Sequence, residues 1–346
     1  MTQSMTIQQA IGRIVGGGNL EREEARQVMG DIMGGAATPA QIGSLITAMR
    51  MKGETADEIT GFAETMRSMA SEVRTERNNL LDTCGTGGDG ADTFNISTTA
   101  ALVAAAGGIR VAKHGNRAMS SKSGSADVLE ALGVSIQLNS EQAARCLDEV
   151  GICFMFAQTY HQSMKYAAGP RKEIGVRTIF NLLGPLTNPA GADRQLLGLF
   201  DRSKTELIAS VLRSLGLKRG LVVASYDGLD EISISAPSKI TELKDGDLLT
   251  YDITPEELGL GTYPIQEVVG GDALHNAAMI RAVFQGAQGA CRDIVLANAG
   301  ACFYVSGHCP TLRDGVQLAA STIDSGRALA KLEQLVDYTG ELSHVS

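Results

Sequence analysis

Helical periodicity dominates the first 75 residues of the chain. Thr38-Pro39 is typical of an N-cap followed by proline in the first helical turn, and Thr55-Ala56-Asp57-Glu58 marks a second helix start. Apolar side chains then recur three or four residues apart on one face of each expected helix: Ile42, Leu45, Ile46 and Met49, then Ile59, Phe62 and Met66. The pattern predicts an all-α block.

After residue 77, short apolar runs alternate with helical stretches. The runs lie at 80–82, 109–112, 152–156 and 221–224, and the helical stretches at 97–106, 123–132, 140–149 and 204–215. Such alternation is typical of a mainly parallel sheet flanked by helices. Because 346 residues exceed one compact domain, we expect two lobes. Residues 1–76 would form a smaller helical lobe, joined by part of 165–195, and residues 77–346 an α/β lobe.

Two later segments depart from the alternation. Lys244-Asp245-Gly246-Asp247 lies between the segments 239–243 and 248–253, which predicts an antiparallel hairpin. From Asp272 onward the pattern is helical again, and its many alanines and glycines favour closely packed helices.

Composition narrows the class of partner. The chain has 40 glycines, no Trp and an aromatic content of 4%, which disfavours a stacking surface for glycans or single-stranded nucleic acid. A formal charge of -9 argues against nucleic acid and anionic membranes as partners. We therefore expect a small-molecule partner.

Cysteine usage and the N-terminal sequence indicate a cytoplasmic protein. The six cysteines form no C-x-x-C pair and no metal-ligand spacing. The N-terminus lacks a basic segment followed by a long apolar run, and no apolar stretch reaches membrane-spanning length.

A glycine-rich loop is the sharpest local feature. Residues 82–90 read Asp-Thr-Cys-Gly-Thr-Gly-Gly-Asp-Gly and precede Asn95-Ile96-Ser97-Thr98-Thr99 at the start of a helical run. A strand, a loop with accessible backbone N–H groups and a helix N-terminus together form a phosphate cradle. The plain alternative is a loop whose glycines only turn the chain. The segment lacks the Gly-Lys-Ser end of a Walker sequence.

A basic segment follows the next apolar run. Lys113-His-Gly-Asn-Arg117 leads through the serines of 120–125 into a helix. These cations and hydroxyls offer charge-assisted donors for a second phosphate-binding segment, although a solvated polar loop fits the same residues.

Acidic and basic candidates lie farther along. Asp227-Gly-Leu-Asp-Glu231 places adjacent carboxylates at a strand end, where oxygen ligands can hold a hard cation; an acidic turn is the alternative. Arg171 can pair with a substrate carboxylate in a planar, bidentate manner. Taken alone, both Arg171 and His161 also suit ordinary surface or packing roles.

In combination, these motifs resemble those of the anthranilate phosphoribosyltransferase family, over roughly residues 5 to 335. The segments that carry the resemblance are Gly85-Thr-Gly-Gly-Asp89, Asn95-x-Ser97-Thr98, Lys113-His-Gly-Asn-Arg117, Lys122-Ser-Gly-Ser-Ala-Asp127, Arg177-Thr-Ile-Phe-Asn-x-x-Gly-Pro-Leu-x-Asn-Pro189 and Asp227-Gly-x-Asp-Glu231.

The resemblance implies a two-lobe architecture like that of nucleoside phosphorylases and phosphoribosyltransferases, with the active site between the lobes. It also implies a homodimer formed through the helical lobe. Phosphoribose would pass from 5-phosphoribosyl 1-diphosphate to the amine of anthranilate, in tryptophan biosynthesis. Mg²⁺, with two ions per subunit, would serve as the cofactor.

The resemblance assigns site residues by matching positions. Those for the diphosphate donor would be Gly85, Gly88, Asp89, Thr93, Asn95, Ile96, Ser97, Thr98, Lys113, His114, Gly115, Asn116, Arg117, Ser121 and Ser125. Anthranilate would contact Gly85, Asn116, Tyr160, His161 and Arg171. Ser97, Asp230 and Glu231 would hold the metal, and Lys113 would join the two carboxylates in catalysis. The chain departs from commoner family versions at Gln158, Gln162 and Tyr166, in the segment near anthranilate.

Two rival functions fit parts of the pattern. A pyrimidine nucleoside phosphorylase would share the fold, but the adjacent Asp230-Glu231 and the full 113–117 motif favour the transferase. A non-catalytic relative that binds nucleic acid would need a basic face, and no long basic run is present.

Overall fold

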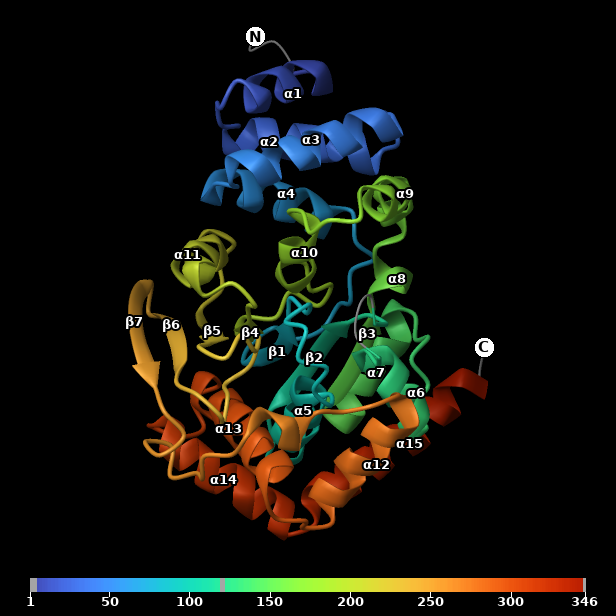
Figure 1. The fold of residues 1–346 in the computed structure, drawn as a ribbon. Helices are drawn as coiled ribbons and strands as arrows, with labels where there is room; N and C mark the ends of the chain where they lie inside the picture. The colour runs from blue at the N-terminus through green and yellow to red at the C-terminus, as the bar shows by residue number, and fades with distance from the viewer. Residues whose placement is uncertain (1–4, 119–121, 345–346) are drawn as a thin grey trace.

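The computed structural model describes residues 5–118 and 122–344. At its centre lies a seven-stranded sheet with the order β3-β2-β1-β4-β5-β6-β7 (Figure 1). The strands are β1 (Leu80–Gly85), β2 (Arg110–Gly115), β3 (Ile152–Phe156), β4 (Arg194–Gly198), β5 (Arg219–Ser225), β6 (Ser238–Lys244) and β7 (Asp247–Ile253). The first five strands are parallel, and β6 and β7 are antiparallel. The prediction of a mainly parallel sheet is confirmed.

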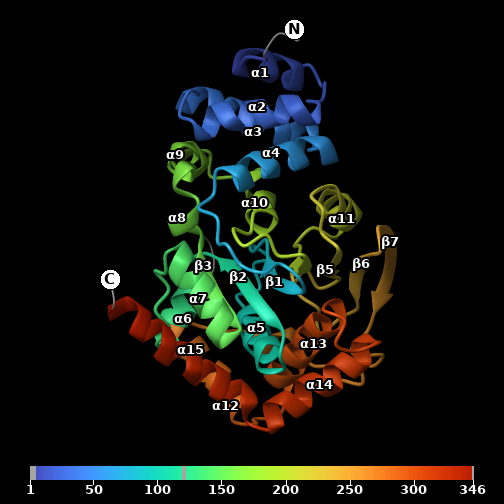
Figure 2. The same ribbon diagram turned by 180° about the vertical axis from the view of Figure 1, so that it is seen from behind.

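Helices gather at one end of the molecule and around the sheet (Figures 1 and 2). The helices of the N-terminal end are α1 (Ile7–Val15), α2 (Arg22–Met33), α3 (Pro39–Lys52) and α4 (Ala56–Ser68). Two short helices from the middle of the chain, α9 (Lys165–Ile174) and α10 (Phe180–Leu183), pack against α2, α3 and α4. We call these six helices the helical end.

The remaining helices pack mostly against the sheet and one another. They are α5 (Ile96–Ala106), α6 (Ser125–Leu132), α7 (Ser140–Val150), α8 (Ala157–Tyr160), α11 (Thr205–Ser214), α12 (Ala273–Phe284), α13 (Ala290–Val305), α14 (Leu312–Asp324) and α15 (Arg327–His344). Short 3₁₀ turns, η1 (Gln162–Met164), η2 (Gly184–Leu186), η3 (Arg202–Lys204) and η4 (Ile265–Val268), complete the connections. None of the helices in the described part of the chain is long and apolar enough to cross a membrane.

The sheet separates two hydrophobic cores. Leu196 and Leu221 enter the core that contains α5 and α13. Their strand neighbours Leu197 and Val222 enter the core that contains α11 and the helical end. Since alternate residues of a strand point to opposite faces, β4 and β5 are buried on both sides, as is usual for parallel strands covered by helices.

The expected helix starts are present. Thr38 and Thr55 both accept a hydrogen bond from the N3 backbone and form capping boxes, with Gln41 and Glu58 as the partners. The apolar stripe of α3, which includes Leu45, is fully buried in the second core. Local sequence therefore determines both where these helices begin and which face they bury.

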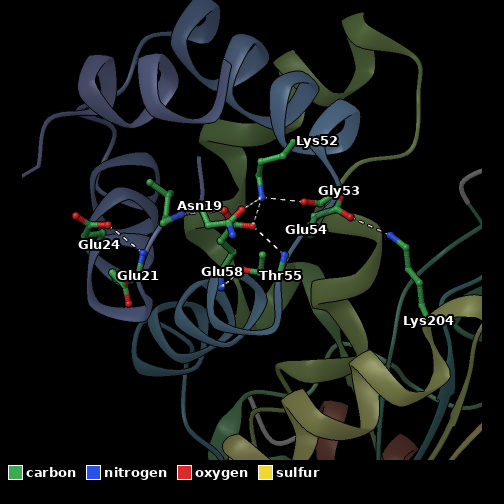
Figure 3. Close-up of polar contacts among 10 residues, drawn as sticks. Asn19, Glu21, Glu24, Lys52, Gly53, Glu54, Thr55, Glu58 and Lys204 are labelled. Atoms are coloured by element: carbon green, nitrogen blue, oxygen red, sulfur yellow. Dashed lines mark hydrogen bonds and ion pairs between the residues drawn. The ribbon is translucent and has the colours of Figure 1, made fainter. Parts of the chain in front are cut away.

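Buried ion pairs hold the helical end together (Figure 3). Lys52 donates to Glu58 at 2.9 Å and to Asn19 at 2.8 Å, while Glu58, which is fully buried, also accepts from the backbone of Leu20. Each charge is therefore satisfied inside the bundle. Glu54 accepts from Lys204 at 2.9 Å, which joins the α3–α4 connection to the turn before α11.

The sequence pattern did not predict strand β4. It did predict the hairpin formed by β6 and β7. Asp245 and Gly246 both have positive φ, 53° and 88°, as a two-residue hairpin turn requires. Close helix packing at the C-terminal end is also confirmed, because a Cβ at Gly300 would meet the backbone of α14.

Candidate active site

The candidate residues meet at the carboxyl edge of the sheet, where strand order changes direction. The chain passes from β1 outward to β2 and β3, then returns to β4 on the other side of β1. Gly85 and Gly198 end these two strands and are paired in the sheet. A crevice outside the strand ends at such a switch point is the usual ligand position in α/β sheets.

The glycine loop lies against the acidic segment that follows β5. The backbone N–H of Gly87 donates to Asp230 Oδ2 at 2.7 Å. A Cβ at Gly85 would collide with the Asp230 carboxylate, and a Cβ at Gly198 with the Asp230 backbone. The strand ends must be glycine because the acidic segment crosses them at close range.

The N-terminus of α5 faces the second carboxylate. Ser97 N–H donates to Glu231 Oε1 at 3.1 Å, which places this carboxylate at the positive end of the helix. Lys113, buried within β2, donates to Ser97 Oγ at 3.2 Å and to Thr83 O at 2.5 Å. The structure therefore brings Ser97, Lys113 and Glu231 together, although they come from three separate segments.

Asp230 and Glu231 lie in an environment that disfavours the charged form of a carboxylate. Burial, and then the charge of Asp89, raises the pKa of Asp230 to about 7. Burial and the neighbouring Asp230 raise the pKa of Glu231 well above its usual range. A bound cation would offset this clustering of acids.

The oxygen donors at this edge fit Mg²⁺. Within the described residues, no three His, Cys, Asp or Glu side chains are grouped to hold a metal on their own. Asp230 and Glu231 supply two carboxylates and Ser97 a hydroxyl. Mg²⁺ is commonly bound by one or two carboxylates together with substrate phosphates, so this incomplete set suits an ion that arrives with a diphosphate.

Side chains around Asn95 tie the loop before α5 to two other segments. Asn95 donates to Ser123 O at 3.1 Å and accepts from Asn276 at 2.9 Å. Thr93 forms a β-bridge with Val269. Asn276, in α12, has no signal in the sequence, since it lies 181 residues from its partner.

The basic segment after β2 is shaped by buried contacts. Asp82, fully buried in β1, accepts from the backbone N–H of His114 at 3.1 Å. The guanidinium of Arg117 pairs with Asp127 at 2.9 Å and with Glu130 at 2.6 Å. The Arg117 side chain is therefore already occupied, whereas Gly115 and the exposed Asn116 leave the front of the segment accessible.

The helix that follows this segment contributes one more candidate. Ser125 Oγ accepts from Thr98 Oγ1 at 3.1 Å, which links the first turns of α5 and α6. Ile96 is buried and packs in the core. Ser121 lies outside the described residues.

The residues expected near anthranilate differ in accessibility. Tyr160 is 1% exposed and donates to Leu138 O at 2.7 Å, which is a packing role. His161 is buried, its Nε2 lies 3.0 Å from Thr187 O, and its ring centroid lies 5.0 Å from that of His114. Burial lowers the pKa of His161 to about 4, so the ring is neutral at pH 7.

Arg171 has a different environment. It is partly exposed, and its guanidinium lies 5.0 Å from the ring centroid of Phe180. Among the residues that the structure describes, no carboxylate pairs with it. Arg171 is thus free to receive an anion, whereas the Tyr160 hydroxyl is not.

Arg177 also contacts the glycine loop. Its guanidinium stacks 4.2 Å from the ring centroid of Phe200, the second residue after β4. It also fills the space where a side chain at Gly88 would lie. The sequence motif contained this residue, but no role was predicted for it.

Comparisons with known proteins place this geometry in a family. Residues 77–329 match the model of the glycosyl transferase family, a/b domain, and residues 8–70 match its helical bundle domain. The anthranilate phosphoribosyltransferase of Brevibacillus brevis is 54% identical over 97% of this chain and 99% of its own length.

Solved structures give the same result. The anthranilate phosphoribosyltransferase from Thermus thermophilus has a TM-score of 0.91 at 44% identity, over 95% of this chain and 99% of that chain. The fold also matches the enzyme from Saccharomyces cerevisiae in complex with PRPP and Mg, with a TM-score of 0.89 at 24% identity, over 97% and 98% of the two chains.

Proposed function

The chain belongs to the anthranilate phosphoribosyltransferase family, and we propose from that premise which of its residues hold each substrate. The protein transfers phosphoribose from 5-phosphoribosyl 1-diphosphate to the amine of anthranilate, a step of tryptophan biosynthesis. The bond between the anomeric carbon and the diphosphate oxygen breaks, and its electron pair leaves with the diphosphate. The amine nitrogen forms the new bond to that carbon and then loses a proton to water.

The donor's diphosphate binds at the glycine loop and the N-terminus of α5. The backbone N–H of Gly88 and the hydroxyl of Ser97 form an anion-binding edge there, and Gly87 and Thr98 line it. Lys113 lies 3.2 Å from Ser97 Oγ and supplies a buried positive charge. The observation that carries this assignment is the convergence of that cation and two carboxylates at the switch point of the sheet. The other members of the donor set are Gly85, Asp89, Thr93, Asn95, Ile96, His114, Gly115, Asn116, Arg117, Ser121 and Ser125.

Asp230, Glu231 and Ser97 hold Mg²⁺, and we propose two ions per subunit. The complex of the yeast relative with PRPP and Mg supports this choice of metal. Mg²⁺ held by these residues would neutralise negative charge on the departing diphosphate. The elevated pKa of Asp230, about 7, also indicates that this carboxylate gains from a nearby cation.

Anthranilate binds on the opposite side of the reacting carbon. The unpaired guanidinium of Arg171 takes the carboxylate, and Asn116 and Gly85 line the approach. His161 shapes the wall as a neutral ring, whereas Tyr160 acts by packing behind it. No side chain is assigned as a base, because the arylamine proton becomes acidic once the C–N bond has formed.

The proposal extends to assembly and location. Val15 and Met51 are 71% and 84% exposed on the helical end, which suits a homodimer formed through that end. The six cysteines are all unpaired, as expected of a cytoplasmic protein. Light scattering at several protein concentrations tests the dimer, and a constant monomer mass would reject it.

The decrease in anthranilate fluorescence tests the function. Purified protein, donor and Mg²⁺ should consume anthranilate, and EDTA should stop the reaction. Asp230→Asn should require at least about tenfold more Mg²⁺ for half-maximal rate, since it removes one charged ligand. Consumption that is indifferent to EDTA and to this change would reject the metal site.

A further inference from the structure

Arg177 occupies a position between the helical end and the sheet. It lies in the connection from α9 to α10, and these helices pack against the helical end. Its guanidinium reaches the glycine loop after β1, where it lies against the backbone of Gly88. Gly88 has φ of 78°, so both the backbone conformation and the arginine exclude a side chain there. The glycine at position 88 therefore leaves the space that the Arg177 guanidinium occupies.

The guanidinium of Arg177 has no anionic partner. In residues 5–118 and 122–344, no carboxylate or carbonyl group forms a hydrogen bond or ion pair with it. Arg50 and Arg145 also lack ion pairs, but they are exposed on the surface. Arg177 differs because it is partly buried and because stacking on Phe200 at 4.2 Å fixes its plane. A planar cation held in this way keeps its N–H groups available for a ligand.

Charge at the site indicates which ligand this is. Asp89, Asp230 and Glu231 place three carboxylates around the glycine loop. Lys113 is the nearby cation of the donor site described above, and Arg117 is occupied by Asp127 and Glu130. A diphosphate carries several negative charges into this acidic edge. A further unpaired guanidinium at the same loop offsets part of that charge.

We propose that Arg177 is a further ligand of the donor's diphosphate, in addition to the donor-binding residues assigned from the family resemblance. The assignment rests on the donor site proposed above. The guanidinium donates to the non-bridging diphosphate oxygens from the side of Gly88, while the backbone N–H groups of the loop donate from beneath. Arg171, six residues earlier, serves the carboxylate of anthranilate instead, so the two unpaired arginines separate the two anionic substrates.

The position of Arg177 has a second consequence. It belongs to the connection between α9 and α10, whereas the glycine loop belongs to the sheet. A diphosphate held by both therefore ties the helical end to the sheet. Release of diphosphate after the transfer breaks that tie, so weakened binding should also appear as weaker product inhibition by diphosphate.

The test uses calorimetry to measure the binding affinity for each half of the donor separately. Inorganic diphosphate with Mg²⁺ and, separately, ribose 5-phosphate are titrated into wild-type protein, Arg177→Gln and Arg177→Lys. A lost charge-assisted hydrogen bond weakens binding roughly 10- to 100-fold. We expect Arg177→Gln to lose that much affinity for diphosphate and to keep ribose 5-phosphate affinity and the KM for anthranilate within about twofold of wild type. Arg177→Lys, which keeps the charge, should lose less.

A matched control exists in the same chain. Arg202 also stacks on an aromatic ring, 4.1 Å from the centroid of Tyr226, outside the donor site. Arg202→Gln removes the same charge and should leave diphosphate binding unchanged.

Three results would overturn the inference. One is unchanged diphosphate affinity in Arg177→Gln. Another is an equal loss in the Gln and Lys variants, which would indicate a structural role. The last is a selective rise in the KM for anthranilate. Failure of wild-type protein to bind diphosphate with Mg²⁺ would instead reject the donor site itself, and this inference with it.

Discussion

Replacement of Gly198 by alanine tests whether the crossing of β4 by the acidic segment positions the two carboxylates that we propose as Mg²⁺ ligands. A Cβ built at Gly198 would lie 1.6 Å from the carbonyl oxygen of Asp230. Ordinary contact begins at 3.4 Å, so the two backbones must separate by about 1.8 Å. Both partners are backbone, and no side-chain rotation can relieve the overlap.

This displacement of the Asp230 backbone should lower the rate of the reaction. Asp230 and Glu231 are adjacent, so movement of the first backbone carries both carboxylates away from Ser97 and the glycine loop. A displacement of about 1 Å at a reacting centre can reduce the rate on the order of 100-fold. We therefore expect kcat/KM of Gly198→Ala to fall at least about 100-fold, with a larger Mg²⁺ requirement.

Anthranilate fluorescence gives kcat/KM, and thermal unfolding gives the temperature below which the variant is assayed. Gly340→Ala is the control. Gly340 lies within α15, has no positive φ, and has no atom within 4 Å of an added Cβ. Alanine there should stabilise the helix by about 0.5–1 kcal/mol and leave activity unchanged. Folded Gly198→Ala with activity within about threefold of wild type would refute the reasoning.

Three further changes test other parts of the structure. Burial lowers the pKa of His161 from 6.5 to about 4, so the unfolded chain binds the proton first and stability falls as pH drops from about 6.5 toward 4. Between pH 7 and pH 5, wild-type protein should therefore lose about 2 kcal/mol more free energy of unfolding than His161→Gln; equal losses in urea titrations would contradict this. Lys52→Met strands the buried carboxylate of Glu58 and should cost about 3 kcal/mol, whereas Arg50→Met on the same helix should cost less than about 0.5 kcal/mol; similar unfolding midpoints would show that the buried pair is unimportant. Arg171→Ala should raise the KM for anthranilate at least about tenfold and leave the KM for the donor within about twofold; equal rises would reject its assignment to the carboxylate.

Much of the fold follows from local sequence. Capping residues such as Thr38 mark helix starts, and Asp245-Gly246 marks the hairpin, because these signals act within a few residues. Strand β4 was missed for a physical reason. It is five residues long, begins with Arg194-Gln195, and follows a turn-rich segment rather than a long helix. Its strand character comes from pairing with β1 and β5 on both sides.

The candidate site likewise has a part that the sequence predicts and a part that depends on the tertiary fold. Motif segments were recognisable because each one is contiguous, as in Lys113 to Arg117. Contacts between segments were not, since Gly87 and Asp230 lie 143 residues apart. Their meeting depends on the return of the chain to β4 and β5 beside β1. The occupied state of Arg117 likewise depends on tertiary packing against α6.

The central claim is that the carboxyl edge of β1 and β4 holds the donor's diphosphate and its metal. A crystal structure with 5-phosphoribosyl 1-diphosphate and Mg²⁺ tests this claim most directly. We expect diphosphate oxygens within hydrogen-bond distance of the loop backbone at Gly88 and of Ser97 Oγ, with Mg²⁺ bound to the carboxylate of Asp230 or Glu231. Diphosphate density elsewhere, with these carboxylates free of metal, would contradict the account.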